Sequence, residues 1–177
     1  MQNDMDILKE TQTVLVHNPC SNMKLASGIF PSKALSDKGL RVILGTDGSS
    51  SNNNLDMFEE IKAATLMAKG KSLDPTALPA QAVLMMATVC GARAQGRAER
   101  CGMLKEGMDA DIALVDFSAP PLMPCHNVLS GLVFSAKGGD VAMTMVRGKI
   151  LYQNGQFPTI DLKFVVEELT TYAIPKL

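Results

Sequence analysis

Two short apolar segments stand out in the first half of the chain. Residues 13–16, and residues 41–44 after an initial arginine, are runs of β-branched and aliphatic side chains, a pattern typical of buried strands. Between them a helix can begin after Pro31 and run to about Lys38, because proline suits a first helical turn and Gly39 stops the helix. Two apolar strands joined by a helix predict a right-handed βαβ unit with a buried parallel sheet.

Helical periodicity returns after the second strand. We expect one helix over residues 55–69 and another over residues 79–87, which begins at a proline. The apolar positions of the first helix recur every three to four residues, at Leu55, Phe58, Ile61, Leu66 and Met67.

The pattern changes near residue 99. Residues 110–116 alternate like a strand, and residues 141–146 and 149–152 are predicted strands joined by a two-residue hairpin turn. Asp161 can cap a closing helix. The second half is therefore predicted to be antiparallel β-structure with one terminal helix.

Composition and charge narrow the class of protein. Over 177 residues, 46% are hydrophobic and 20% are charged, which is typical of a globular chain. The net charge of −1 and the lack of a basic stripe argue against nucleic acid and anionic membranes as partners. No apolar run reaches the roughly 18 residues of a membrane helix, and the polar start is unlike a signal peptide. The 4 cysteines show no Cys-x-x-Cys spacing. We therefore expect a cytoplasmic protein with reduced thiols.

Polar loops are predicted directly after both strands of the βαβ unit, at residues 17–22 and 49–54. His17 and Asp47 follow neighbouring strands, and the carboxyl ends of parallel strands are where α/β proteins place working groups. We expect both side chains to face one cavity. The alternatives are a turn-capping aspartate and a hydrogen-bonded structural histidine. Elsewhere, Cys125-His126 lacks a ligand-spaced companion, and Gly138-Gly139 is predicted to be a turn.

Three longer motifs resemble a known family. They are HNPCSNMKLASG at residues 17–28, GTDG at residues 45–48 with SNNNLD at residues 51–56, and GMLKEGMDADI at residues 102–112. The first two resemble the 5-methylthioadenosine/S-adenosylhomocysteine deaminases, which sit beside the triazine chlorohydrolases and guanine deaminases in the amidohydrolase superfamily. The third is similar to the segment by which the superfamily returns to its small β domain.

The resemblance implies an α/β fold, the C-terminal fragment of a metal-dependent hydrolase TIM barrel. Residues 1–98 would carry barrel strands seven and eight, and residues 99–177 the C-terminal part of a composite β-sandwich with a closing helix. We place the boundary at residues 95–102.

The resemblance also implies a chemistry. Asp47 would be a catalytic ligand of one divalent metal, zinc or iron, which lowers the pKa of a bound water. Asp47 would take a proton from that water, and hydroxide would displace ammonia from an aminopurine nucleoside such as S-adenosylhomocysteine or 5-methylthioadenosine. His17 would be a catalytic residue near the pocket, and Ser51 and Asn52 would bind substrate.

The histidine ligands of that family have no counterpart here, since the only two histidines, His17 and His126, lie elsewhere. A catalytic zinc needs about three protein ligands, so we expect this chain alone not to retain the metal. We expect the N-terminal half of the barrel, or self-association, to complete it. A related chlorohydrolase or guanine deaminase-like hydrolase, and an inactive truncated or assembly module, are the alternatives.

Overall fold

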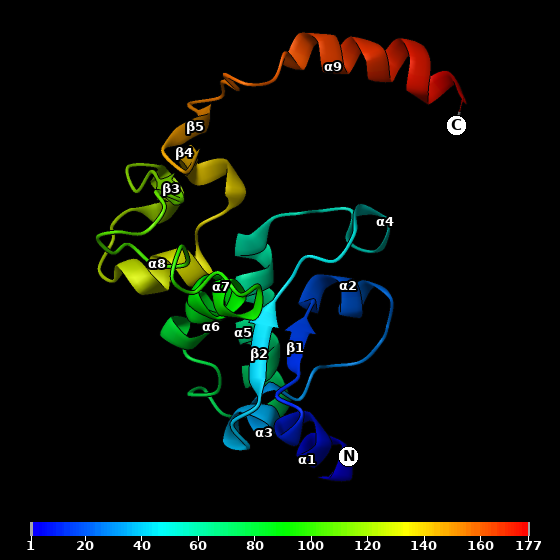
Figure 1. Ribbon diagram of the computed structural model, residues 1–177, viewed down its shortest axis with the longest axis vertical. Coiled ribbons are helices and arrows are strands. Elements are labelled where there is room, and N and C mark those ends of the chain that lie inside the picture. The colour runs from blue at the N-terminus through cyan, green and yellow to red at the C-terminus, as the bar shows by residue number, and fades with distance from the viewer. Residues whose placement is uncertain (1, 177) are drawn as a thin grey trace.

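The computed structural model describes residues 2–176 as a mixed α/β chain (Figure 1). A parallel pair of strands lies among helices, a three-stranded antiparallel sheet follows, and the C-terminal helix stands apart from both. In chain order the main elements are α1 (Gln2–Glu10), β1 (Val14–His17), α2 (Pro19–Lys24), α3 (Ser32–Asp37), β2 (Arg41–Leu44), α4 (Ser49–Asn52), α5 (Met57–Ser72), α6 (Ala80–Ala87), α7 (Val89–Ala94), β3 (Ile112–Val115), α8 (Val128–Phe134), β4 (Val141–Val146), β5 (Lys149–Gln153) and α9 (Leu162–Glu168).

The predicted βαβ unit is confirmed. Strands β1 and β2 pair in parallel, and α3 ends just before Gly39, whose φ of +68° favours glycine. The predicted loops after both strands are wrong in part, because α2 and α4 are short helices within them. Pro19 is the first residue of α2, where its fixed φ suits a helix and its missing N–H costs nothing.

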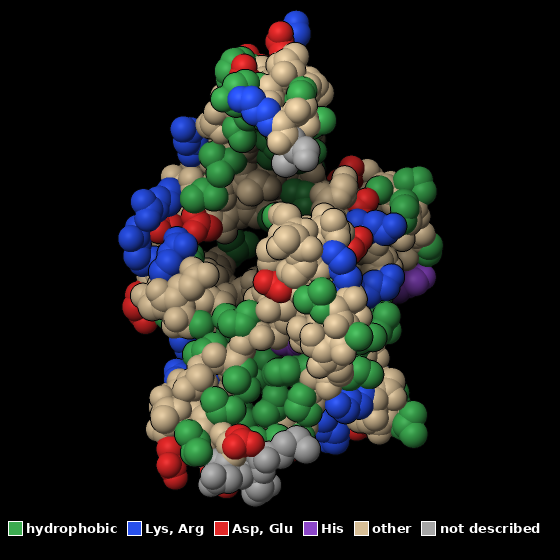
Figure 2. All heavy atoms as spheres, turned by 90° about the vertical axis from the view of Figure 1, so that its right-hand side faces the viewer, with side chains coloured by type: hydrophobic (Ala, Val, Ile, Leu, Met, Phe, Trp, Pro, Cys, Tyr) green, Lys and Arg blue, Asp and Glu red, His purple; other side chains and the backbone are tan. Residues whose placement is uncertain are grey.

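The parallel sheet is covered on one face only, so the prediction of a buried sheet is half right. Leu44 is buried at 6% exposure against the helices, whereas Val16 on the other face is 53% exposed. Figure 2 views the chain from the side on which β1 and α2 lie, and shows hydrophobic side chains gathered on the lower half of that face. Exposed large apolar residues of α1 and α2 include Ile7 and Met23.

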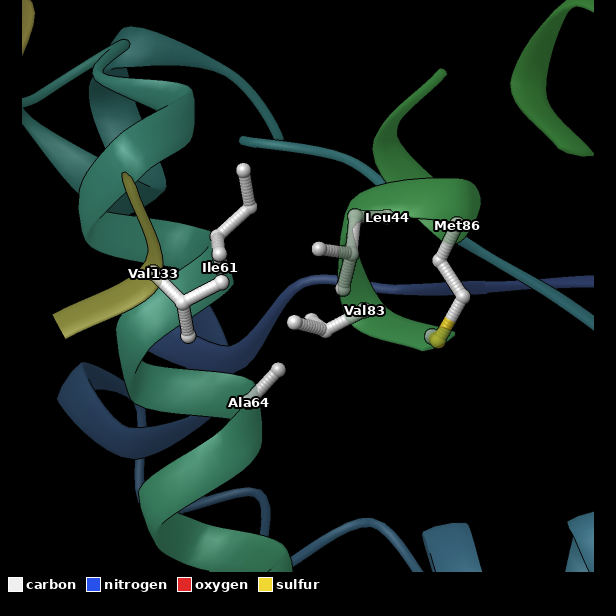
Figure 3. Packing of buried hydrophobic residues seen from close by; sticks show 6 residues of the cluster. All are labelled: Leu44, Ile61, Ala64, Val83, Met86 and Val133. Atoms are coloured by element: carbon white, nitrogen blue, oxygen red, sulfur yellow. The ribbon is translucent and has the colours of Figure 1, made fainter. Parts of the chain in front are cut away.

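The main core lies between β2 and the helices that follow it (Figure 3). Its buried members are Leu44, Ile61, Ala64, Val83, Met86 and Val133. The predicted helix begins later, at Met57, and its predicted apolar positions Leu55 and Leu66 are 60% and 49% exposed, whereas Ile61 is buried as predicted. Beside Ile61, the buried face carries the small residues Ala64 and Ala68, which let neighbouring helices approach closely.

Helix α8 was not expected from the sequence. It lies after residue 99, yet it packs on α5 and α6 and places Val133 in the core. The core of the first half therefore includes a side chain from the second half. The division of the chain at residues 95–102 stays a prediction.

The antiparallel sheet has the strand order β3-β4-β5. The predicted hairpin between β4 and β5 is confirmed, with Arg147 and Gly148 at φ +49° and +77°. Two central residues with positive φ match the twist of the flanking strands.

The closing helix α9 begins where the sequence predicts. The Asp161 carboxylate accepts a hydrogen bond from the Phe164 N–H at 3.0 Å, and every residue of α9 is exposed. A π-helical turn (Leu169–Ala173) continues it. Over residues 2–176, the structure shows no helix with the length and apolar character needed to cross a membrane.

A second capping aspartate joins the two halves of the chain. Asp56 accepts from the Phe58 N–H at 2.9 Å, which caps α5, and from the Gly138 N–H at 2.7 Å. An added Cβ at Gly138 would lie 3.0 Å from Asp56 Oδ2, so glycine permits this approach. The predicted Gly138-Gly139 turn is therefore an anchoring point.

We expect Asp56→Ala to lower the free energy of unfolding by about 2 kcal/mol, since it removes a helix cap and a second charge-assisted hydrogen bond. Urea unfolding followed by circular dichroism measures this. Asp161→Ala is the matched control, because it removes the same kind of cap from an exposed helix, and it should cost less than about 0.5 kcal/mol. Equal losses in the two variants would contradict the anchoring role.

Candidate functional site

Asp47 lies three residues beyond the end of β2, at the carboxyl edge of the parallel pair. Its φ of +60° is in the left-handed region, which non-glycine residues adopt rarely and often at functional sites. Asp47 Oδ2 accepts from Ser21 Oγ at 2.7 Å, and Oδ1 accepts from the Gly48 N–H at 2.8 Å. The side chain is exposed, and these two bonds fix its direction.

The same donors set the ionisation of Asp47. The Ser21 hydroxyl first, and also the Gly48 N–H, lower the pKa of the Asp47 carboxyl below its ordinary value. The carboxylate is therefore a stable anion at neutral pH with lone pairs open to solvent. Such a group can bind a cation.

His17 has a different environment. Its side chain is only 1% exposed and stacks on Phe30, with ring centroids 4.4 Å apart. Burial lowers its pKa from 6.5 to about 4, and its Nδ1 has no hydrogen-bond partner among the described residues. His17 pairs with Leu44 across the strands, so it shares the face that packs on the helices. A catalytic role for His17 stays a prediction, and the structure uses its ring for packing.

Ser51 and Asn52 lie in α4, the short helix that follows Asp47. Ser51 Oγ donates to the Gly48 carbonyl at 3.0 Å. Asn52 Nδ2 donates to the Thr46 carbonyl and to Glu60 Oε1, both at 2.6 Å. Both side chains therefore stabilise the loop, and a role in substrate binding stays a prediction for each.

Two residues of this site were missed in the sequence. Ser21 is 1% exposed and lies in α2, where the sequence predicts a loop. Glu60 is also 1% exposed, and a charge in a first helical turn is ordinarily solvated. The available signal was spacing, since Glu60 lies four residues before Ala64 and eight before Ala68 on the buried stripe of α5.

Metal-binding side chains do not cluster in the described part of the chain. Within residues 2–176, no group of three or more histidine, cysteine, aspartate or glutamate side chains is placed to hold a metal ion. A catalytic zinc needs about three protein ligands and an open position. Asp47 alone fits one ligand position, as an exposed anionic oxygen donor.

Comparison with known proteins identifies the family of this chain. The profile of the "Amidohydrolase family" matches residues 1–151. The chain belongs to the amidohydrolase family. Among related amidohydrolases, the 5'-deoxyadenosine deaminase of Methanosarcina acetivorans is 52% identical over 96% of this chain and 39% of its own length. The 5-methylthioadenosine/S-adenosylhomocysteine deaminase of Thermococcus onnurineus is 53% identical over 84% of this chain and 34% of its own.

Solved structures with a similar fold include two that contain zinc. An adenosine deaminase from Xanthomonas campestris with bound zinc matches with a TM-score of 0.93 and 36% identity, over 99% of this chain and 40% of that one. Atrazine chlorohydrolase from Arthrobacter aurescens, also with zinc, matches with a TM-score of 0.82 and 25% identity, over 96% and 38%. The chain thus spans about two fifths of the length of the relatives it matches.

Proposed function

We propose that this chain is the C-terminal part of a metal-dependent deaminase that acts on aminopurine nucleosides. Candidate substrates are 5'-deoxyadenosine, 5-methylthioadenosine and S-adenosylhomocysteine, which the names of its relatives contain. The observation that carries the proposal is Asp47, an anion held by Ser21 and Gly48 at the carboxyl end of a parallel strand. Barrel enzymes place their catalytic groups at this end.

The proposed architecture is a barrel whose last two β/α units are residues 1–98, followed by the C-terminal part of a composite β-sandwich in residues 99–177. The open edges and face of the β1–β2 pair support it, because a two-stranded sheet is rarely stable without further strands. A cavity of about 350 Å³ beside β2 also supports it, since Val42 and Ile43 line this cavity together with Met86 and further strands would cover them. The proposed partner is the remainder of the barrel.

Within this proposal, Asp47 would hold one divalent metal, and zinc is favoured because similar structures contain it. When bound, such a metal would lower the pKa of a water molecule so far that hydroxide is available at neutral pH. Ser21 and Gly48 keep the Asp47 oxygens aimed and ionised, so that the carboxylate is ready to bind the cation or accept a proton. The other ligands would come from the remainder of the barrel.

Reconstitution tests this function. The chain is mixed with the preceding three fifths of a related 5'-deoxyadenosine deaminase, loaded with zinc, and assayed for ammonia release from 5'-deoxyadenosine, S-adenosylhomocysteine and guanine, and for chloride release from atrazine. We expect ammonia from an adenosine-type substrate. Activity on guanine or atrazine alone would favour a related hydrolase. A folded, zinc-loaded mixture without any turnover would contradict the proposal.

A further inference from the structure

One buried carboxylate connects the two segments that meet at Asp47. Glu60 Oε2 accepts from the Cys20 N–H at 3.1 Å, and Oε1 accepts from Asn52 Nδ2 at 2.6 Å. Cys20 is next to Ser21, whose hydroxyl donates to Asp47. The Glu60 side chain therefore contacts both segments that the Ser21–Asp47 hydrogen bond joins.

The second connection passes through Asn52. Its two amide hydrogens go to Glu60 Oε1 and to the Thr46 carbonyl, and both of these are acceptors. Rotating the amide by half a turn would set Asn52 Oδ1 against a carboxylate, so this orientation is fixed. Glu60 thus holds the backbone one residue before Asp47 through a single side chain.

The Cys20 side chain also lies beside Glu60. Burial, and next the adjacent Glu60 carboxylate, raise the pKa of the Cys20 thiol to about 12. Lys24, also on α2, donates to Asn53 Oδ1 and to the Ser50 carbonyl, which joins the same two segments on the exposed side.

We propose that Glu60 is the positioning residue for Asp47: it clamps α2 and the loop of residues 46–52 together so that the Asp47 carboxylate is presented at one place. The inference rests on the proposed function only in taking Asp47 as the metal ligand. An apolar residue of similar volume would fill the same space, but it would leave the Cys20 N–H and one Asn52 amide hydrogen without an acceptor.

Glu60→Met in the full chain separates positioning from packing, because it keeps the volume and removes both acceptors. The measurement is amide NMR, with Asp47→Ala as the reference for a Gly48 N–H that has lost its Asp47 partner. We expect the Gly48 amide signal to move toward its place in Asp47→Ala, and the Cys20 amide to exchange about tenfold faster. Ile61 and Val83, in the core, should exchange at the wild-type rate.

Two variants serve as controls. Glu59→Met changes the neighbouring exposed carboxylate, which binds Asn54, and should leave the Gly48 and Cys20 signals unchanged. Glu60→Gln keeps one acceptor and should therefore give a smaller change than Glu60→Met. If the Glu60→Met variant does not fold, Glu60→Gln is used for the test. A Gly48 signal at its wild-type position in a folded Glu60 variant would overturn the inference. Equal acceleration of exchange at Ile61, Val83 and Cys20 would do the same, by showing a role in the whole core.

The reconstituted protein gives a second readout. There we expect Glu60→Met to lower kcat about tenfold or more, with KM unchanged, as for other groups that orient a metal ligand. An unchanged kcat would count against positioning. If the wild-type mixture itself is inactive, the proposed function fails, and the amide signals of the free chain still decide the role of Glu60.

Discussion

Replacing Asp47 by asparagine is expected to lower ammonia release from the reconstituted protein by more than about 100-fold. Loss of a group that only orients a metal ligand costs up to about 100-fold, and loss of the ligand itself should cost more. Asparagine has a similar volume and tolerates the left-handed backbone at this position, so the fold should persist. It cannot supply the anionic oxygen that Ser21 and Gly48 hold in place. Zinc content should fall together with the rate.

Asp116→Asn is the matched control for Asp47→Asn. Asp116 is also exposed, accepts from the Ser118 hydroxyl and N–H, and has a pKa lowered by those bonds. It lies after β3, away from the parallel strands. The rate should stay within about twofold of wild type. Equal rates for Asp47→Asn and the wild-type protein would remove Asp47 from the chemistry.

Acidification from pH 7 to pH 4 is expected to lower the free energy of unfolding by about 3 kcal/mol through His17 alone. In the unfolded chain His17 takes up a proton near pH 6.5, whereas in the folded chain burial lowers its pKa to about 4. Between these values the unfolded state binds more protons, so stability falls as the pH falls. Below about pH 4 both states are protonated and this loss is complete.

Urea unfolding at half-unit pH steps measures the effect. In His17→Phe, which can still stack on Phe30 but cannot ionise, most of the slope between pH 6.5 and 4 should disappear. His126→Phe, at an exposed position, should keep it. Hydrogen bonds lower the pKa values of the Asp47, Asp74 and Asp116 carboxyls, so their contributions to stability are lost as the pH falls below the ordinary aspartate range. A His17→Phe variant with the wild-type slope would show that another group is responsible.

Local signals in the sequence were sufficient for much of the fold. The strands β1 and β2, the β4–β5 hairpin and the cap at Asp161 each follow from apolar runs or turn residues within a few positions. The placement of Asp47 after β2 follows from the same short-range pattern.

Contacts between distant segments could not be predicted in this way. Leu66 has the spacing of a core residue, but it is 49% exposed, because small residues of α5 face the core instead. Glu60 is an acidic residue in a first helical turn, a position that is ordinarily solvated. It is buried because its partners Cys20 and Asn52 come from other elements. Val133 joins the core only because α8 packs back on α5 and α6.

Zinc content of the purified chain, alone and after reconstitution with the preceding part of a related deaminase, tests the account most directly. With one exposed anionic donor at Asp47 and a zinc requirement of about three protein ligands, we predict well under about 0.1 equivalent in the chain alone and about one equivalent in the complex. One equivalent of zinc bound tightly by the chain alone, or none in a folded complex, would contradict it.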